Sequence, residues 1–243
     1  FAVAFAVETA PPWGVARGGI LDIALIRDGV LGFDIASLAD FMPNNWSSWP
    51  TTYQRVTIDS QSPDEVVIRT ERDWGEVELV TLFRLRDNDP RIKIVTTMTN
   101  RGKQQLTDLL TGYIVWPDGG HLFGVPGLSG VISSSEAQAF GDWSAAYDEH
   151  WVLGLHAPFS EFVSYGGRDR YLPHTLAAGE SKTFKAVLQI ENRGDLSLLV
   201  KEEIRAAGLD SGKIAGLVTD AEGRNIAAPA VIVSRHDKVI AWT

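Results

Sequence analysis

Apolar and polar residues alternate along most of the first 190 positions of this chain. In the segment 75–87, Val77, Leu79 and Phe83 fall on one face of an extended strand. The same alternation recurs in the segments 53–61, 64–73, 91–102 and 179–192. A period of two, with Gly, Asn and Pro at the segment ends, is typical of antiparallel strands that bury one face and leave the other in water. The pattern predicts an all-β protein.

One segment has helical spacing. Residues 195–208 place Leu196, Leu199 and Ile204 on one side of a helix, with Asp195 positioned to cap its start. Gly208 stands where a left-handed residue would end the helix. Because the following residues 209–212 have the composition of a short linker, we interpret this helix as a connector that leads out of the first domain.

The pattern changes after the linker. Residues 213–243 predict a strand, a turn from Asp220 to Gly223, a second strand and the start of a third. A piece of two or three strands is not stable by itself. We therefore expect two units, residues 1–208 and residues 209–243, the second being the truncated start of a small β-sandwich whose other strands lie further along a longer protein.

Composition excludes several classes of function. The chain has 22 Lys and Arg against 31 Asp and Glu, a formal charge of −9. This charge argues against nucleic acid and anionic membranes as partners, because both require clustered cations. No segment reaches the about 18 apolar residues of a spanning helix. The lack of cysteine removes disulfides, zinc thiolate sites and a cysteine nucleophile. It leaves the compartment open, with an exported or periplasmic location slightly preferred to a cytoplasmic one.

The stretch WPDGGH, residues 116–121, has two interpretations. His121 could be a general acid or a ligand, with Asp118 as the carboxylate that orients it. Alternatively, Asp118, Gly119 and Gly120 form the turn of a hairpin, and His121 begins the returning strand. Consecutive glycines favour the turn, so we expect His121 at the end of a sheet.

A second candidate site is rich in aromatic residues. The stretch NNWSSWPTTYQ combines the aromatic rings and amides of Asn44, Asn45, Trp46, Trp49 and Tyr53. Aromatic faces flanked by amides suit sugar rings, which stack through C–H groups and direct hydroxyls to amides. The other interpretation is that the tryptophans close one end of the sandwich. Together with Asp118 and His121, these five residues form the predicted carbohydrate-binding site.

Other polar features have simpler explanations. His150 and His156 are six positions apart, about 20 Å along a strand at about 3.3 Å per residue, which is too far for a shared metal. We predict no metal site, no cofactor and no catalytic residue. The rival hypothesis is an enzyme with His121, His150 or His156 as acid and Glu149 or Glu161 as base. The runs ERDWGEVE, FRLRDND and YGGRDRY are interpreted as solvated strand faces and turns.

The first 208 residues resemble galactose mutarotase-like domains. The resemblance rests on the many long strands, the strand entry L-x-A-G-E-S from Leu176 to Ser181, and the helix after the last strand. It implies a supersandwich of two large antiparallel sheets packed face to face. The histidine-containing signatures of the sugar epimerases in this superfamily are not matched, so no position is carried over as catalytic. A fold resemblance alone does not determine chemistry.

Residues 213–233 resemble the opening of carboxypeptidase regulatory-like domains, which are small transthyretin-like sandwiches. The matching positions are Gly216, Val218, Asp220, Gly223, Ile226, Ala230, Val231 and Val233, with one extra residue before the final Ala. The phrases PPWGVARGGILDIAL, DFMPNNWSSWPTTYQ and TERDWGEVEL are similar to accessory domains that precede PHP-type metallohydrolase domains in bacteria. These resemblances imply a non-catalytic accessory module of a larger hydrolytic protein, with carbohydrate and the C-terminal domains of that protein as partners. The alternative is a sugar-modifying enzyme of the aldose epimerase or polysaccharide lyase type.

Overall fold

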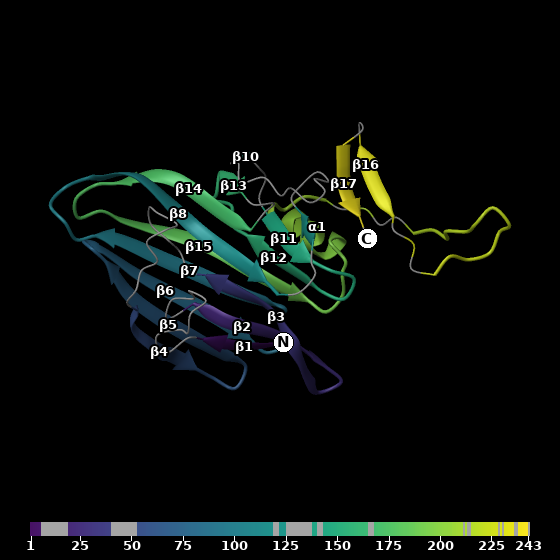
Figure 1. Cartoon of the computed structure of the whole chain (residues 1–243), viewed down its shortest axis with the longest axis horizontal. Helices are drawn as coiled ribbons and strands as arrows, with labels where there is room; N and C mark the ends of the chain where they lie inside the picture. Colours follow the sequence, from purple (N-terminus) through teal and green to yellow (C-terminus); the bar gives the residue numbers. More distant parts are fainter. Residues whose placement is uncertain are drawn as a thin grey trace.

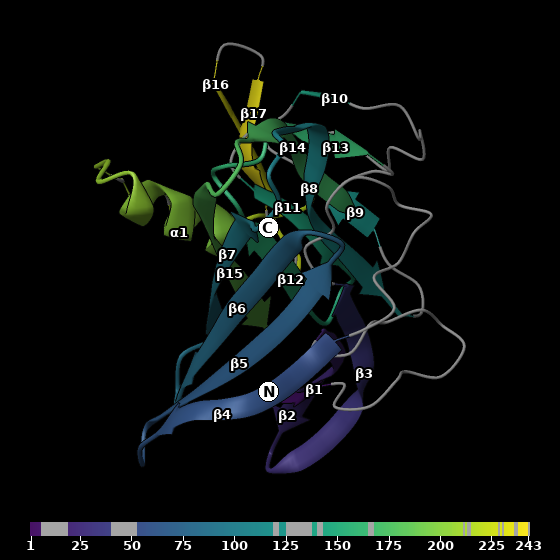
Figure 2. The same cartoon turned by 90° about the vertical axis from the view of Figure 1, so that its left-hand side faces the viewer.

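The computed structural model describes residues 1–5, 19–39, 53–118, 122–124, 138–139, 143–164, 168–210, 212, 215–227, 229, 231–235 and 238–242. Within these residues, antiparallel strands form two large sheets that face each other, with one short helix outside them (Figures 1 and 2). The all-β sandwich predicted from the alternation is confirmed. No helix in the described part of the chain is long and apolar enough to cross a bilayer.

The first sheet has seven described strands. Their order across the sheet is β1 (Ala2–Phe5), β2 (Ile20–Arg27), β3 (Val30–Ala39), β8 (Leu106–Pro117), β14 (Asp169–Leu176), β13 (Phe162–Ser164) and β10 (Gln138–Ala139). The second sheet has eight described strands. Their order is β4 (Tyr53–Gln61), β5 (Glu65–Trp74), β6 (Val77–Arg86), β7 (Arg91–Asn100), β15 (Ser181–Glu191), β12 (Val152–His156), β11 (Trp143–Tyr147) and β9 (Leu122–Gly124).

The core lies between the two sheets. Phe83 and Ile94 on β6 and β7 are buried against Ile23 of β2 and Tyr113 of β8. The exposure of residues along β6 and β7 follows the predicted alternation, so the inward faces inferred from the sequence are confirmed. Complete burial of one such side chain stabilises the fold by about 1.5–3 kcal/mol.

Three hydroxyl side chains interrupt this apolar core and bond to one another. The Oγ1 atoms of Thr81 and Thr96 lie 3.0 Å apart, and Thr96 Oγ1 lies 3.3 Å from the hydroxyl of Tyr113. All three residues are buried. A buried hydroxyl without a partner would be destabilising, so the bonds in this row make polar residues tolerable at inward positions. The row also connects the two sheets.

Helix α1 (Ser197–Ala206) covers the outer face of the second sheet (Figure 2). Leu199 packs on β12 at Gly154, where a Cβ atom would collide with the leucine side chain. All of β12 is therefore buried, one face by the core and the other by the helix. At the start of the helix, Asp195 accepts a hydrogen bond from the backbone N–H of Ser197 at 3.0 Å. Gly208 has a φ of 63°, so the predicted end of the helix is confirmed.

The C-terminal residues contain the predicted turn and a small separate sheet. The N–H of Gly223 donates to the carbonyl of Asp220 at 3.0 Å, which closes the turn. The strands β16 (Ile232–Arg235) and β17 (Lys238–Trp242) pair with each other and with no other described strand. Assignment of residues 209–243 to a regulatory-like sandwich stays a prediction.

Candidate functional site

Most of the predicted carbohydrate site cannot be placed. Asn44, Asn45, Trp46, Trp49 and His121 lie outside the described residues. Tyr53 begins β4, where its backbone is opposite Arg72 of β5. Of the seven residues proposed from the sequence, Asp118 is the one whose side chain is described. The assignment of all seven residues to a sugar site stays a prediction.

Asp118 follows β8 and begins a connection between the two sheets. Its N–H donates to the carbonyl of Ile35 on β3 at 2.9 Å. Strands flank the connection as expected, with β8 ending at Pro117 and β9 beginning at Leu122. The hairpin interpretation was wrong, because β9 pairs with β11 in the other sheet. Both edges of β8 are already paired, with β3 and β14, so a returning strand has no free edge to join.

Asp118 belongs to a group of three carboxylates that also contains Asp22 and Asp34. Partial burial, followed by hydrogen bonds and charge repulsion from Asp22 and Asp118, raises the pKa of Asp34 to about 8. Because the side chain of Asp34 is exposed to solvent, the neighbouring carboxylates of Asp22 and Asp118 contribute more to this raised pKa than burial does. A carboxyl group with this pKa is protonated at neutral pH and donates a hydrogen bond. The described residues contain no cluster suited to a metal ion, and this group is no exception.

Two of the three histidines proposed for the rival enzyme, His150 and His156, are engaged elsewhere. His150 lies before β12 rather than on it, and its Nε2 is 3.2 Å from Glu149 Oε1 on the exposed surface. His156 is buried under α1, where Nδ1 contacts the carboxylate of Glu203 and Nε2 lies 2.9 Å from Gln189 Oε1. Through these contacts, His156 holds α1 on the second sheet. Glu161 is exposed and precedes β13.

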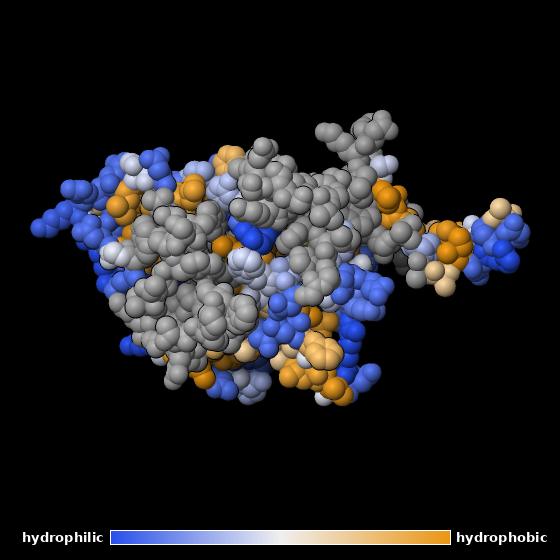
Figure 3. Space-filling view, viewed as in Figure 1, coloured by the Kyte–Doolittle hydropathy of each residue, from blue (hydrophilic) through white to orange (hydrophobic). Residues whose placement is uncertain are grey.

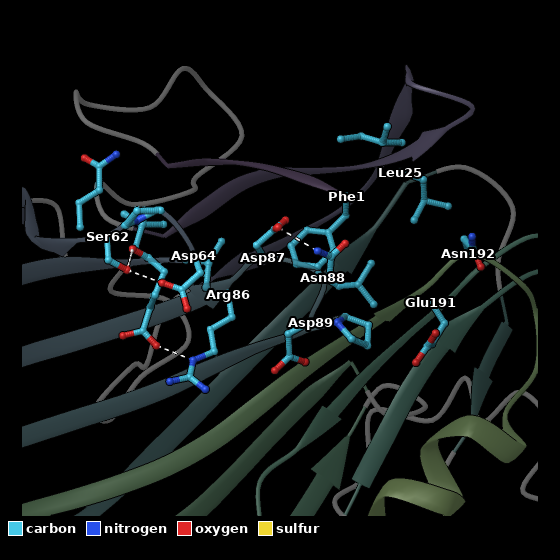
Figure 4. A pocket seen from close by; sticks show the side chains of 18 residues that line it. Phe1, Leu25, Ser62, Asp64, Arg86, Asp87, Asn88, Asp89, Glu191 and Asn192 are labelled. Carbon is cyan, nitrogen blue, oxygen red and sulfur yellow. Dashed lines mark hydrogen bonds and ion pairs between the residues drawn. The ribbon is translucent and has the colours of Figure 1, made fainter.

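A cavity that we call the end pocket opens at one end of the sandwich and has a volume of about 730 Å³ (Figure 4). The turns between β4 and β5 and between β6 and β7 form one side, and β2 and the end of β15 form the other. Its apolar lining includes Phe1, Leu25, Leu85 and Ile190. Its polar lining includes Ser62, Asp64, Asp87, Asn88, Glu191 and Asn192. Its volume lies in the range of about 300–1,000 Å³ that is typical of small-molecule sites, and its lining is divided about equally between apolar and polar groups.

Hydrogen bonds hold the two turns of the end pocket together. The N–H of Asp87 donates to the carbonyl of Asp64 at 2.8 Å, which joins one turn to the other. The hydroxyl of Ser62 donates to Asp64 Oδ1 at 2.8 Å and is the main cause of the lowered pKa of that carboxyl. Asn88, with a φ of 57°, donates from Nδ2 to Asp87 Oδ2 at 2.8 Å. The polar rim is therefore held in place by hydrogen bonds within the protein itself.

An exposed apolar surface adjoins the end pocket. Ile26 lines the pocket and is also 45% exposed. The tip of the β2–β3 hairpin next to it exposes Val30, Leu31 and Phe33, in orange at the lower edge of Figure 3. The sequence interpretation missed this site. It treated FRLRDND as a solvated run, whereas Leu85, Asp87 and Asn88 of that run line the pocket.

Comparisons with known proteins give only distant structural likenesses. No family model matches the chain, and no curated protein matches it. A TPR-domain containing protein from Parabacteroides distasonis superposes with a TM-score of 0.42 and 14% identity, over 56% of this chain and 34% of that one. The galactosidase domain of the alpha-galactosidase-sucrose kinase AgaSK has a TM-score of 0.42 and 12% identity, over 72% of this chain and 30% of that one. A putative aldose 1-epimerase from Escherichia coli K12 has a TM-score of 0.38 and 16% identity, over 56% and 68%. This chain spans about a third of the length of the first two, so its function has to be inferred from its own residues.

Proposed function

We propose that this chain is a non-catalytic accessory module that binds carbohydrate through the end pocket, within a larger hydrolytic bacterial protein. The observation that carries the proposal is the end pocket itself. It combines a volume of about 730 Å³ with an apolar lining and a rim of carboxylate, amide and hydroxyl groups. A sugar ring presents the complementary surface, with C–H groups on its faces and hydroxyls at its edge.

Particular side chains of the pocket suit these two parts of a sugar. The ring of Phe1 and the side chain of Leu85 offer apolar surface for C–H groups. Asp64 and Asp87 can accept hydrogen bonds from sugar hydroxyls, and Asn192 can both donate and accept them. Since an ionised carboxylate strengthens the bonds that it accepts, the acidic rim favours polyhydroxyl ligands.

The accessory role rests on the resemblance of residues 213–233 to regulatory-like domains and of the first 208 residues to mutarotase-like domains. It is supported by the absence of the epimerase histidine signatures from the sequence. It is also supported by the position of His156, which is buried between Glu203 and Gln189 rather than in the end pocket.

The test is a titration of the chain with a panel of neutral oligosaccharides, followed by nuclear magnetic resonance. We expect shifted resonances from the turns at residues 61–66 and 85–90. Asn192→Ala should weaken binding at least severalfold. Asp108→Asn is the matched control, because Asp108 is exposed near the start of β8, at the opposite end of the sandwich. Binding that is equally strong in Asn192→Ala, or that shifts resonances elsewhere, contradicts the proposal.

A second candidate function is a sugar-modifying enzyme, and one observation favours it. The carboxylates of Asp22 and Asp118 flank Asp34, whose pKa of about 8 makes it a proton donor at neutral pH. Most glycosidases use a protonated carboxyl together with an ionised one. Under this hypothesis, the chain accelerates conversion of a sugar or glycoside, and Asp34→Asn abolishes the acceleration. Unaltered sugars after prolonged incubation with the chain exclude it for the sugars tested.

A further inference from the structure

Strand β4 lies at an open margin of the second sheet (Figure 1). It pairs with β5 on one side and with no other described strand on its other side. Arg55 and the residues 58–61 of this strand are exposed. Because no described strand uses the backbone N–H and C=O groups along this margin, they are available to another chain. Addition of a strand to such a margin is a common way in which proteins associate.

The sequence of β4 carries little protection against such pairing. Edge strands usually avoid it through lysine, proline, a bulge or a covering segment. Residues 53–61 contain neither lysine nor proline. The register of β4 on β5 does shift, at residues 53–55 and again at residues 58–60, but residues 55–58 between these two places pair regularly. The irregularities therefore protect only the ends of the strand.

The two faces of this central stretch differ in character. Ile58 is opposite Ile68 of β5, which packs against the core, so Ile58 lies on the inner face of the sheet. Val56, two positions earlier, shares that face. Ile58 is nevertheless 60% exposed, because β4 is the last strand of the sheet. The alternate positions lie on the outer face and are polar: Arg55, Thr57 and, at the register shift, Asp59.

This stretch is complementary to itself in an antiparallel arrangement. With a twofold axis at Thr57, position 55 of one copy is opposite position 59 of the other, and position 56 is opposite position 58. Arg55 then meets the partner's Asp59 twice on the outer face, and Val56 meets the partner's Ile58 twice on the inner face. A slip by one or two positions places Arg55 opposite an uncharged residue instead.

We infer that β4 is an interface between two copies of this chain, joined antiparallel about Thr57 so that their second sheets become continuous. Opposite charges and apolar side chains that face each other across two strands both stabilise the pairing. Since each copy contributes the same strand, the contact is used up in a dimer and forms no longer chains. The contact is smaller than a standard interface of about 20–30 residues a side, so we expect a weak dimer, formed at about 0.1–1 mM.

The test exchanges the charges of β4 and follows the whole chain by sedimentation velocity. Arg55→Asp places two carboxylates opposite each other in the dimer, and Asp59→Arg places two guanidiniums opposite each other. Each variant alone should dimerise about tenfold more weakly or worse, because two attractive pairs become repulsive. An equimolar mixture of the two variants should restore the dimer, since every arginine then faces an aspartate. Lys103→Asp, the same change of charge in the exposed connection between β7 and β8, is the control and should leave the dimer unchanged.

A cross-link tests the register independently of the charges. The chain has no cysteine, so Thr57→Cys places its single thiol at the twofold axis. The Cα atoms of directly opposite residues in antiparallel strands lie about 4.5–5.5 Å apart, within the range of a disulfide. Oxidation of the two thiols by diamide should therefore link two copies covalently. Thr183→Cys is the control, because it is exposed on β15, which is paired on both sides within the sheet.

Several results would overturn the inference. One is the absence of a dimer up to about 1 mM. Another is a dimer that is equally stable in Arg55→Asp and Asp59→Arg, because it would then form through a different surface. A mixture of the two variants that stays monomeric excludes this register. If urea denaturation shows that a charge variant is unfolded, the cross-link decides: Thr57→Cys that links no faster than Thr183→Cys rejects the interface.

Discussion

Replacement of His156 by Phe tests how α1 is held on the second sheet. The side chain of Gln189 donates from Nε2 to Glu191 Oε1 at 2.7 Å and to the carbonyl of Leu198 at 3.4 Å. This fixes the orientation of the amide, so its Oε1 atom faces His156 and can only accept. On the other side of the ring, the carboxylate of Glu203 also accepts. The imidazole ring of His156 therefore lies between two acceptors, Gln189 Oε1 and the carboxylate of Glu203.

The cost of this substitution follows from the groups that it leaves behind. Phe fills the space of the imidazole but offers no donor, so Gln189 Oε1 and the Glu203 carboxylate both lose a bond. The His156 side chain is 8% exposed and that of Glu203 is 23% exposed, so water can replace only part of the loss. A buried acceptor without a partner costs about 1–3 kcal/mol, and stranding a buried charge costs more. We expect the free energy of unfolding to fall by about 2–3 kcal/mol.

Urea denaturation followed by tryptophan fluorescence measures this loss, and hydrogen exchange locates it. Residues 197–206 should lose protection, whereas β6 and β7 should keep most of theirs. His150→Phe is the control, because that side chain is 62% exposed and, among the residues that the structure describes, forms an ion pair only with Glu149. Its effect should stay within about 0.5 kcal/mol. A His156→Phe variant as stable as the His150→Phe control would refute this account of the helix.

Three further predictions concern other groups. The Asp34 carboxyl keeps its proton up to about pH 8 in the native state, whereas the unfolded chain loses it near pH 3.8. The free energy of unfolding should therefore fall as the pH rises through this range. After allowance for solvent screening, Asp34→Asn should raise the free energy of unfolding by about 1 kcal/mol at pH 8 and leave it unchanged at pH 3. The hydrogen bond from Arg205 lowers the pKa of Glu202 most, burial opposes it, and the bond from Arg91 adds to it, so that the pKa falls to about 2. The folded protein should therefore lose stability as the pH falls from 4.5 towards 2. Glu202→Gln should lower the free energy of unfolding by about 1 kcal/mol at pH 7 and make it depend less on pH between 4.5 and 2, as measured by urea denaturation. An unchanged dependence on pH counts against the ion pairs. Gly154→Ala should destabilise the chain by about 1–3 kcal/mol in the same assay, because its Cβ displaces Leu199, and an unchanged midpoint would show that the helix moves freely.

Local patterns predicted the elements of this fold better than its pairings. The alternation in 75–87 and 91–102 identified β6 and β7 and their buried faces, because those strands pair with sequence neighbours. The end of α1 at Gly208 was also predicted, since it depends on local backbone geometry. The pairing of β9 with β11 was not predicted, because it depends on which strand edges remain free in the whole sheet.

The candidate sites were harder to predict for the same reason. The end pocket is assembled from two turns, a strand of the opposite sheet and the end of β15, which are far apart in sequence. In isolation, Asp64 and Asp87 are ordinary turn residues. Asp118 was singled out from its sequence context, but its neighbours Asp22 and Asp34 lie on strands whose register shifts between Ile20 and Ile26. Such bulges change which residues meet, and alternation alone does not reveal them.

The position of β15 in the second sheet determines when this domain can complete its folding. β15 pairs with β7 on one side and with β12 on the other, so it alone joins the β4–β7 meander to the strands β12, β11 and β9. During synthesis the meander can form early, because its pairings are local. The other half must wait until about 80 further residues after β7 have been made, and closing that long loop adds an entropic barrier. A ribosome-bound chain that stops before residue 191 should therefore present β7 as an open edge, and chaperone binding or aggregation should be concentrated in that interval.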